Sequence, residues 1–109
     1  MDEDLGEVSH DYLVVEFSGE VFEWRGPAPF HFVRVPENVA EEIGEEAARI
    51  SYGWGMIPGV LTLGGTRWYT SLWPKDGGYL VPLKDAVRRA EGVQVGDEVS
   101  LSMIVGAKA

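Results

Sequence analysis

The chain has 109 residues, 45% of them hydrophobic, which suits one folded domain with its own core. It contains no cysteine, so disulfides, thiolate metal sites and a cysteine nucleophile are excluded. Its net charge is −9, and so acidic a chain is an unsuitable partner for nucleic acid, which binds basic surfaces.

The acidic excess lies in the first half of the chain. Residues 1–50 carry 13 acidic and 3 basic residues, whereas residues 51–109 carry 5 acidic and 6 basic ones. No apolar run approaches the roughly 20 residues of a membrane helix, and the acidic start is unlike a signal peptide. We therefore expect a cytoplasmic protein with no membrane partner, whose second half alone offers a basic pocket to a small anion.

Residues 1–11 are acidic and lack an apolar period, so they predict a flexible tail. A single domain is expected over residues 12–105, followed by a short tail at 106–109. Tyr12 to Trp24 is rich in β-branched and aromatic residues and predicts the first strand, with a bulge or bend at Ser18-Gly19.

Two prolines make the segment after Trp24 a turn, and the alternation from Phe30 to Val35 predicts a second strand. Pro36 then opens a helix with a glutamate-rich outer face. Its apolar residues fall at helical spacing: Val39, Ile43, Ala47 and Ile50. Gly44 weakens this helix, which must therefore pack against the rest of the fold.

The next strand is predicted from Met56 to Leu63, with an interruption near Pro58-Gly59. Gly64-Gly65 indicates a tight hairpin turn, because such turns need positive φ. The return strand runs from Thr66 to Trp73. One of its faces carries Trp68, Thr70 and Leu72, and the other carries Arg67, Tyr69, Ser71 and Trp73.

A turn over residues 74–78 and a strand over 79–83 lead into a short helix from Lys84 to Glu91, which Gly92 ends. The last strand is expected over residues 98–105. Six or seven short strands with two helices and no βαβ alternation predict a mainly β fold. The expected architecture is a small closed or partly closed antiparallel β-barrel with two capping α-helices.

Three motifs in this order carry a family resemblance. They are F-x-F-V-x-V-P from Phe30, W-x-T-S-L-x-P from Trp68 and P-x-K-x-A-V-R-R-A-x-G-x-x-x-G-D from Pro82. The chain resembles a widespread bacterial family catalogued as a domain of unknown function. The resemblance implies a small β-barrel and names no catalytic residue. It also implies that some relatives are fused to a bacteriocin-protection domain of OmpD-associated type, for which this chain has no matching segment.

Basic residues of the last helix suggest an anion site. Lys84 and Arg88 are four residues apart and would project from one helix face beside free N–H groups. Arg67 is a third candidate from the neighbouring strand. The alternative is that Lys84 is solvated and that Asp85 pairs with Arg89, as surface charges commonly do.

Aromatic residues gather around the glycine-rich turns, where they would line a pocket or form the barrel core. Trp54, between two glycines, is the least core-like and is assigned to a pocket rim. Thr70-Ser71 lacks the glycine-flanked elbow of serine hydrolases. His31 lacks a metal-binding spacing, so we expect no metal, no cofactor and no catalytic residue.

The sequence thus favours a non-catalytic module that binds a small organic ligand with an acidic group near the last helix. Its expected contacts are Arg67, Ser71, Lys84 and Arg88, with walls from Trp54, Trp68 and Tyr79. Two alternatives stay open: a protein-interaction module using the acidic helix over residues 37–49, and an enzyme with an unrecognised site. Pairing of edge strands would make a homodimer.

Overall fold

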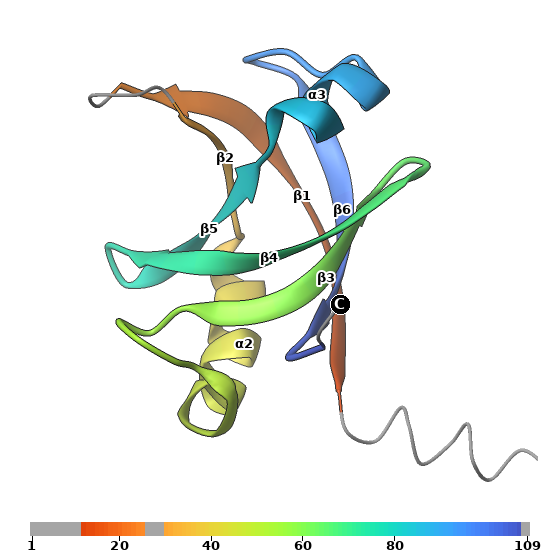
Figure 1. Ribbon diagram of the computed structural model, residues 1–109. Helices are drawn as coiled ribbons and strands as arrows, with labels where there is room; N and C mark the ends of the chain where they lie inside the picture. The colour runs from red at the N-terminus through yellow and green to blue at the C-terminus, as the bar shows by residue number, and fades with distance from the viewer. Residues whose placement is uncertain (1–11, 26–29, 108–109) are drawn as a thin grey trace, which may run out of the picture.

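The computed structural model describes residues 12–25 and 30–107, so the predicted N-terminal tail and most of the first turn lie outside it. Six strands pair antiparallel around a closed barrel in the order β1-β2-β5-β4-β3-β6 (Figure 1), which confirms the predicted architecture. The strands are β1 (Leu13–Trp24), β2 (Phe30–Arg34), β3 (Ile57–Leu63), β4 (Thr66–Lys75), β5 (Gly78–Leu83) and β6 (Glu98–Val105), and the helices are α2 (Glu37–Ile50) and α3 (Asp85–Glu91).

The long strand β1 changes partner along its length. Leu13 to Glu20 pairs with β6, and Val21 to Trp24 pairs with β2. Gly19 precedes the change, where a Cβ atom would stand 2.7 Å from Val33 Cγ1 and 3.1 Å from the Arg34 carbonyl oxygen. Strand β1 is continuous through Ser18-Gly19, where a bulge or bend was predicted, and Gly19 instead allows the close approach of Val33 and Arg34 of β2.

Strand β3 runs without the interruption that Pro58-Gly59 predicted. It pairs with β4 on one side and with β6 on the other. A Cβ atom on Gly59 would overlap Met103 Cε and lie 2.8 Å from the Ile104 carbonyl oxygen. Gly59 therefore allows β6 to lie close to β3 and does not interrupt the strand. Pro58 also accepts a hydrogen bond from Gly106 N at 2.7 Å, so the chain remains attached to the barrel just beyond β6.

Strand β4 is joined to each of its two neighbours, β3 and β5, by a tight hairpin turn. Gly64-Gly65 joins β3 to β4 as predicted. The turn between β4 and β5 is shorter than predicted, because Lys75 already pairs with Gly78. Only Asp76 and Gly77 remain in the loop, with φ of 53° and 78°. Positive φ at both central residues is the requirement of the type I′ hairpin turn, and Asp-Gly meets it.

The barrel interior is filled by inward-facing side chains of all six strands and is closed at opposite ends by the two helices (Figure 1). Helix α2 buries Val39, Ala40 and Ile43 against it, and α3 buries Val87. Closure leaves none of the six strands at a sheet edge, so the edge pairing expected for a homodimer has no free strand among the described residues. No described helix is long and apolar enough to cross a membrane.

A second apolar group lies on the outside of the barrel wall. We call it the outer aromatic cluster; it consists of Phe22, Trp24, Phe30, Phe32 and Trp73. Phe32 is at its centre and is fully buried, although neighbouring Val33 belongs to the interior. The ring centroid of Phe32 lies 6.0 Å from those of Phe22 and Trp24, 6.1 Å from that of Phe30 and 5.1 Å from that of Trp73.

Candidate functional site

A hollow of about 410 Å³ opens beside the start of α3. We call it the α3 hollow. Its walls are largely apolar, and its charged or titratable groups come from β2 and from the junction of β5 with α3. The lining residues are Phe30, His31, Trp73, Pro82, Leu83, Lys84 and Asp85.

Strand register brings the walls together. His31 lies opposite Leu83 where β2 pairs with β5, and Trp73 lies opposite Leu80 where β4 pairs with β5. The rings of Phe30 and Trp73 meet with their centroids 5.7 Å apart and their planes at 59°, a tilted arrangement that aromatic pairs favour. Two aromatic rings from different strands thus form one side of the hollow.

Lys84 is the cation of the α3 hollow. It is the N-cap residue of α3, with φ −70° and ψ 152°, and the helix begins only at Asp85. The sequence placed Lys84 inside the helix, but its extended backbone shows that it immediately precedes the helix. Its carbonyl oxygen still accepts the first helical hydrogen bond, from Arg88 N at 3.0 Å. Lys84 Nζ donates to the Tyr69 carbonyl oxygen at 3.3 Å.

Lys84 therefore keeps donors for a ligand. An ammonium group has three N–H donors, and the bond to Tyr69 is long for one of them. No carboxylate within residues 12–25 and 30–107 forms an ion pair with Lys84. The side chain is exposed, so it can turn toward an anion that enters the hollow.

The acid of the α3 hollow is already paired. Arg88 Nη2 donates to Asp85 Oδ1 at 2.5 Å, which corrects the expected pairing of Asp85 with Arg89. This hydrogen bond and the charge of Arg88 lower the pKa of Asp85, and the charges of Arg89 and His31 add to the effect. Asp85 is thus held ionised, with its charge offset by a residue outside the hollow.

The remaining sequence-predicted contacts do not line the α3 hollow. Arg67 is exposed on β4 opposite Thr62. Ser71 is hydrogen-bonded to the Tyr52 hydroxyl at 2.5 Å. Trp54 is 93% exposed, so it is outside the core as predicted.

Trp68 and Arg88 are held within the fold rather than offered to a ligand. Trp68 is buried in the interior cluster and does not line the α3 hollow. Its indole Nε1 and Arg88 Nε are both buried and find no hydrogen-bond partner among the described residues. Of the seven predicted contacts, only Lys84 lines the α3 hollow.

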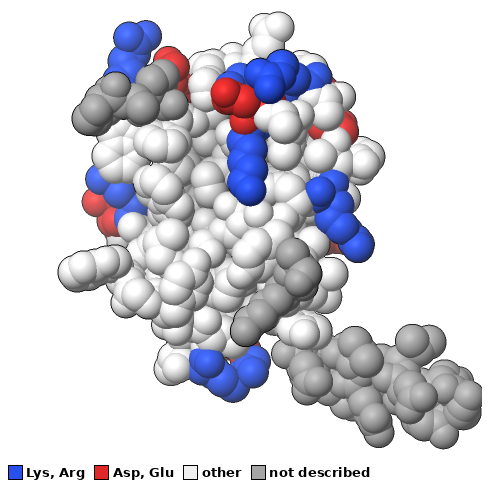
Figure 2. All heavy atoms as spheres, in the orientation of Figure 1, with Lys and Arg blue, Asp and Glu red and all other residues white. Residues whose placement is uncertain are grey.

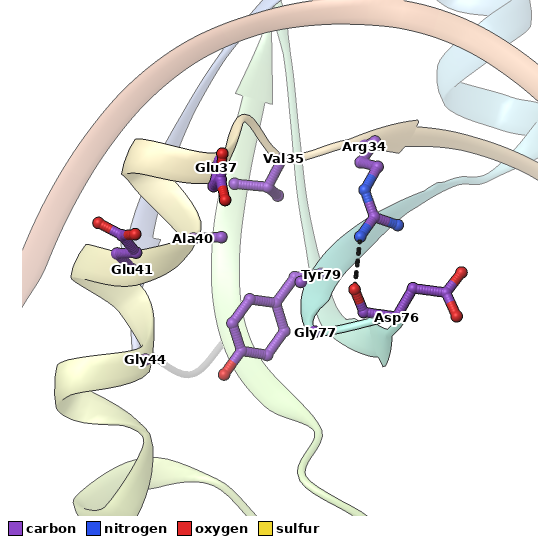
Figure 3. A pocket seen from close by; sticks show the side chains of 10 residues that line it. Arg34, Val35, Glu37, Ala40, Glu41, Gly44, Asp76, Gly77 and Tyr79 are labelled. Atoms are coloured by element: carbon purple, nitrogen blue, oxygen red, sulfur yellow. Dashed lines mark hydrogen bonds between the residues drawn. The ribbon is translucent and has the colours of Figure 1, made fainter.

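Tyr79 lines a different cavity, between α2 and the β4–β5 turn (Figure 3). This cavity measures about 470 Å³, and Glu37 and Glu41 of α2 form part of its wall. Arg34 is its cation, but Arg34 Nη2 donates to the carbonyl oxygens of Lys75 at 2.9 Å and Asp76 at 3.3 Å. Because Arg34 already binds the turn, the cavity presents mainly acids to a ligand.

The apolar walls of the α3 hollow, which come from Phe30, Trp73 and Pro82, were not predicted from the sequence. Alternation did place Trp73 on the face of β4 opposite Trp68 and Leu72, which was a usable signal. The pairing of β2 with β5 was the absent information, because it joins segments about fifty residues apart in the chain. Among the described residues, no three His, Asp or Glu side chains gather where they could hold a metal ion.

Comparison with known proteins identifies the family and no activity. No curated protein matches the chain. A family model matches residues 17–103, which extend from β1 into β6 and include the whole α3 hollow. The chain therefore belongs to the family described as Domain of unknown function (DUF1905).

Proposed function

We propose that this protein is a non-catalytic binding module for a small organic molecule with a planar apolar body and an acidic group. The ligand binds in the α3 hollow, with its body against Phe30 and Trp73 and its acidic group at Lys84. The observation that carries the proposal is the convergence of an aromatic wall and an ammonium group without a carboxylate partner among the described residues.

The size and chemistry of the hollow suit this ligand class. Ligand pockets commonly measure roughly 300–1,000 Å³ and combine apolar walls with a few polar groups; the α3 hollow measures about 410 Å³. A planar ring gains dispersion energy on the indole of Trp73, and a carboxylate gains a charge-assisted hydrogen bond from Lys84. The aromatic wall alone would accept any planar apolar molecule, and Lys84 alone would accept any small anion, so selectivity requires both.

The surrounding charge limits which anions fit. The chain carries a net charge of −9, so a long polyanion meets repulsion that a single acidic group largely avoids. Figure 2 shows a broad area without charged residues on one face of the barrel, with both basic and acidic side chains around it. A small, mostly apolar molecule with localised charge is therefore favoured over nucleic acid.

Biphenyl monocarboxylate is a suitable probe, with uncharged biphenyl carboxamide as its control. Calorimetry and tryptophan fluorescence should report binding of the carboxylate, and the carboxamide should bind more weakly. Replacement of the cation in Lys84→Ala should weaken carboxylate binding about tenfold, as expected for the loss of about 1.4 kcal/mol.

Arg67→Ala is the matched control, because Arg67 is an exposed cation of β4 that does not line the hollow. We expect its affinity for the probe to equal that of the wild type. Absence of binding, or equal affinity of wild type and Lys84→Ala, would contradict the proposed function. A loss confined to Arg67→Ala would place the anion elsewhere on β4.

A further inference from the structure

We infer that the ligand is elongated and carries an acidic group at each end, spanning the outer aromatic cluster from Lys84 to Lys75. The inference rests on the proposed function and adds a second anchor to the same ligand. It comes from a second hollow, of about 660 Å³, which adjoins the other part of the outer aromatic cluster. This hollow, here the Trp24 hollow, is lined by Phe22, Glu23, Trp24, Arg25, Arg34, Lys75, Asp76 and Leu80.

Phe32 separates the two hollows. The α3 hollow is lined by Phe30 and Trp73, and the Trp24 hollow by Phe22 and Trp24. All four rings pack around the fully buried Phe32. A ligand that extends from one hollow toward the other therefore lies along the rings that surround Phe32, here called the aromatic ridge.

Lys75 provides the second anchor. Its ammonium group lies over the indole ring of Trp24, 4.5 Å from the centroid, a distance typical of a cation–π contact. This contact positions the ammonium group at the border of the ridge. No carboxylate forms an ion pair with Lys75 within the described part of the chain.

Three of the other charged groups of the Trp24 hollow already have partners within the protein. Glu23 Oε1 lies 3.8 Å from Arg25 Nη2. Arg34 donates to the carbonyl oxygens of the β4–β5 turn. Asp76 also lines this hollow, and its carboxylate points away from Arg34 (Figure 3). No described carboxylate, Asp76 included, forms an ion pair with Lys75, so its ammonium group keeps donors for a ligand.

Charge complementarity selects the ligand class. Lys75 and Lys84 are the two lysines that the structure describes, and they line the hollows on either side of one aromatic ridge. In a chain of net charge −9, two lysines without carboxylate partners among the described residues favour a ligand with two separated anionic groups. An elongated aromatic diacid has this form, with its rings on the ridge and its ends at the lysines.

The test compares matched mono- and dicarboxylates of biphenyl and of the longer terphenyl. We expect at least one para,para-dicarboxylate to bind wild-type protein about tenfold tighter than its monocarboxylate, which exceeds the statistical gain from two equivalent ends. In Lys75→Ala the dicarboxylate should bind no more than about twofold tighter than the monocarboxylate, which is the statistical gain alone, and monocarboxylate affinity should stay at the wild-type value. Lys75→Met, which keeps an apolar stem over Trp24, should behave in the same way and separates loss of charge from loss of packing.

The outcomes distinguish this inference from the proposed function. If monocarboxylates bind through Lys84 but neither dicarboxylate binds more tightly, the second anchor is wrong and the proposed function stands. The same holds if the preference for a dicarboxylate survives in Lys75→Met. If no monocarboxylate binds, or if Lys84→Ala binds as well as the wild type, the proposed function fails as well.

Discussion

The inner core and the outer aromatic cluster are two apolar groups on opposite sides of the same barrel wall. Inside, α2 and α3 close both ends, and residues such as Val33 and Val81 are fully buried. Outside, Phe32 is equally buried, but Phe30 is 48% exposed and Trp24 is 40% exposed. The outer cluster thus has a buried centre and an uncovered rim.

This difference in exposure assigns different roles to the two apolar groups, because one contributes to the stability of the fold and the other offers surface for binding. Burial of apolar surface in the inner core stabilises the fold, and that surface is no longer accessible to a ligand. The rim of the outer cluster retains apolar surface that a ligand can still remove from water, and contiguous exposed apolar surface commonly marks an interaction site. We therefore expect substitutions at the centre of the outer cluster to act on folding and substitutions at its rim to act on binding.

The largest expected effect compares Phe17→Ala, in the inner core, with Phe32→Ala, at the centre of the outer cluster. Both rings are buried, so each substitution should lower the free energy of unfolding by about 3–5 kcal/mol. Urea denaturation followed by fluorescence measures both. A loss below about 1 kcal/mol for Phe32→Ala alone would show that water readily replaces its ring, and the cluster would then be ordinary surface.

The next largest effect is expected at Phe30, on the exposed rim of the outer aromatic cluster. Phe30→Ala removes a half-exposed ring and should cost at most about 1.5 kcal/mol of unfolding free energy, well below the cost at a buried site. It should nevertheless weaken biphenyl monocarboxylate binding about tenfold, because Phe30 is a wall of the α3 hollow. Calorimetry and urea denaturation on one preparation would provide both numbers.

Trp54→Ala is the control for the rim. Trp54 is more exposed than Phe30 but lines neither the α3 hollow nor the Trp24 hollow. It should change neither probe affinity nor stability by a measurable amount. Weaker probe binding in Trp54→Ala would restore the sequence-based assignment of Trp54 to a pocket rim.

The barrel could be predicted because its signals are local. Alternation placed Arg67, Tyr69, Ser71 and Trp73 on one face of β4, and Gly92 ended the last helix at φ 66°. The outer cluster could not be predicted in this way. Its rings come from β1, β2 and β4, and alternation does not say that an outward Phe32 will be fully buried.

The candidate site was predicted only in part for the same reason. Lys84 was singled out as a cation at the start of a helix, yet the helix begins one residue later and Lys84 donates to Tyr69. Its aromatic neighbours depend on the register between β2 and β5, which pairs His31 with Leu83. That register is set by the closure of the barrel, and the sequence of neither strand alone indicates it.

A smaller effect concerns α2, which closes one end of the inner core. Gly44 is exposed within the helix, and a Cβ atom there would meet no heavy atom within 4 Å. Gly44→Ala should therefore raise the free energy of unfolding by about 0.5–1 kcal/mol. Thermal denaturation tests this, and unchanged probe affinity would confirm that α2 acts as a cover and not as part of the α3 hollow.

The smallest effect concerns the charge that borders the rim. Arg88 lowers the pKa of Asp85 by hydrogen bonding and by its charge, so Arg88→Ala should move that pKa up toward its ordinary value. A carboxyl whose pKa is lower in the folded than in the unfolded state stabilises the fold above its ordinary pKa. This contribution is lost as the pH falls through the folded-state pKa. Arg88→Ala should therefore be less sensitive than wild type to acid in that range.

An NMR titration of the Asp85 carboxyl in both proteins measures the shift directly. Because Asp85 is exposed, solvent screens the pair and the effect on stability should be small. The effect on the α3 hollow is more informative, since an Asp85 without its arginine adds uncompensated negative charge beside Lys84. Biphenyl monocarboxylate should then bind Arg88→Ala more weakly than wild type near neutral pH, where both the probe and Asp85 are ionised. Equal affinity of the two proteins at that pH would place Asp85 outside the electrostatic reach of the bound acid, and Lys84 would then be the charged lining residue of the α3 hollow that acts on the probe.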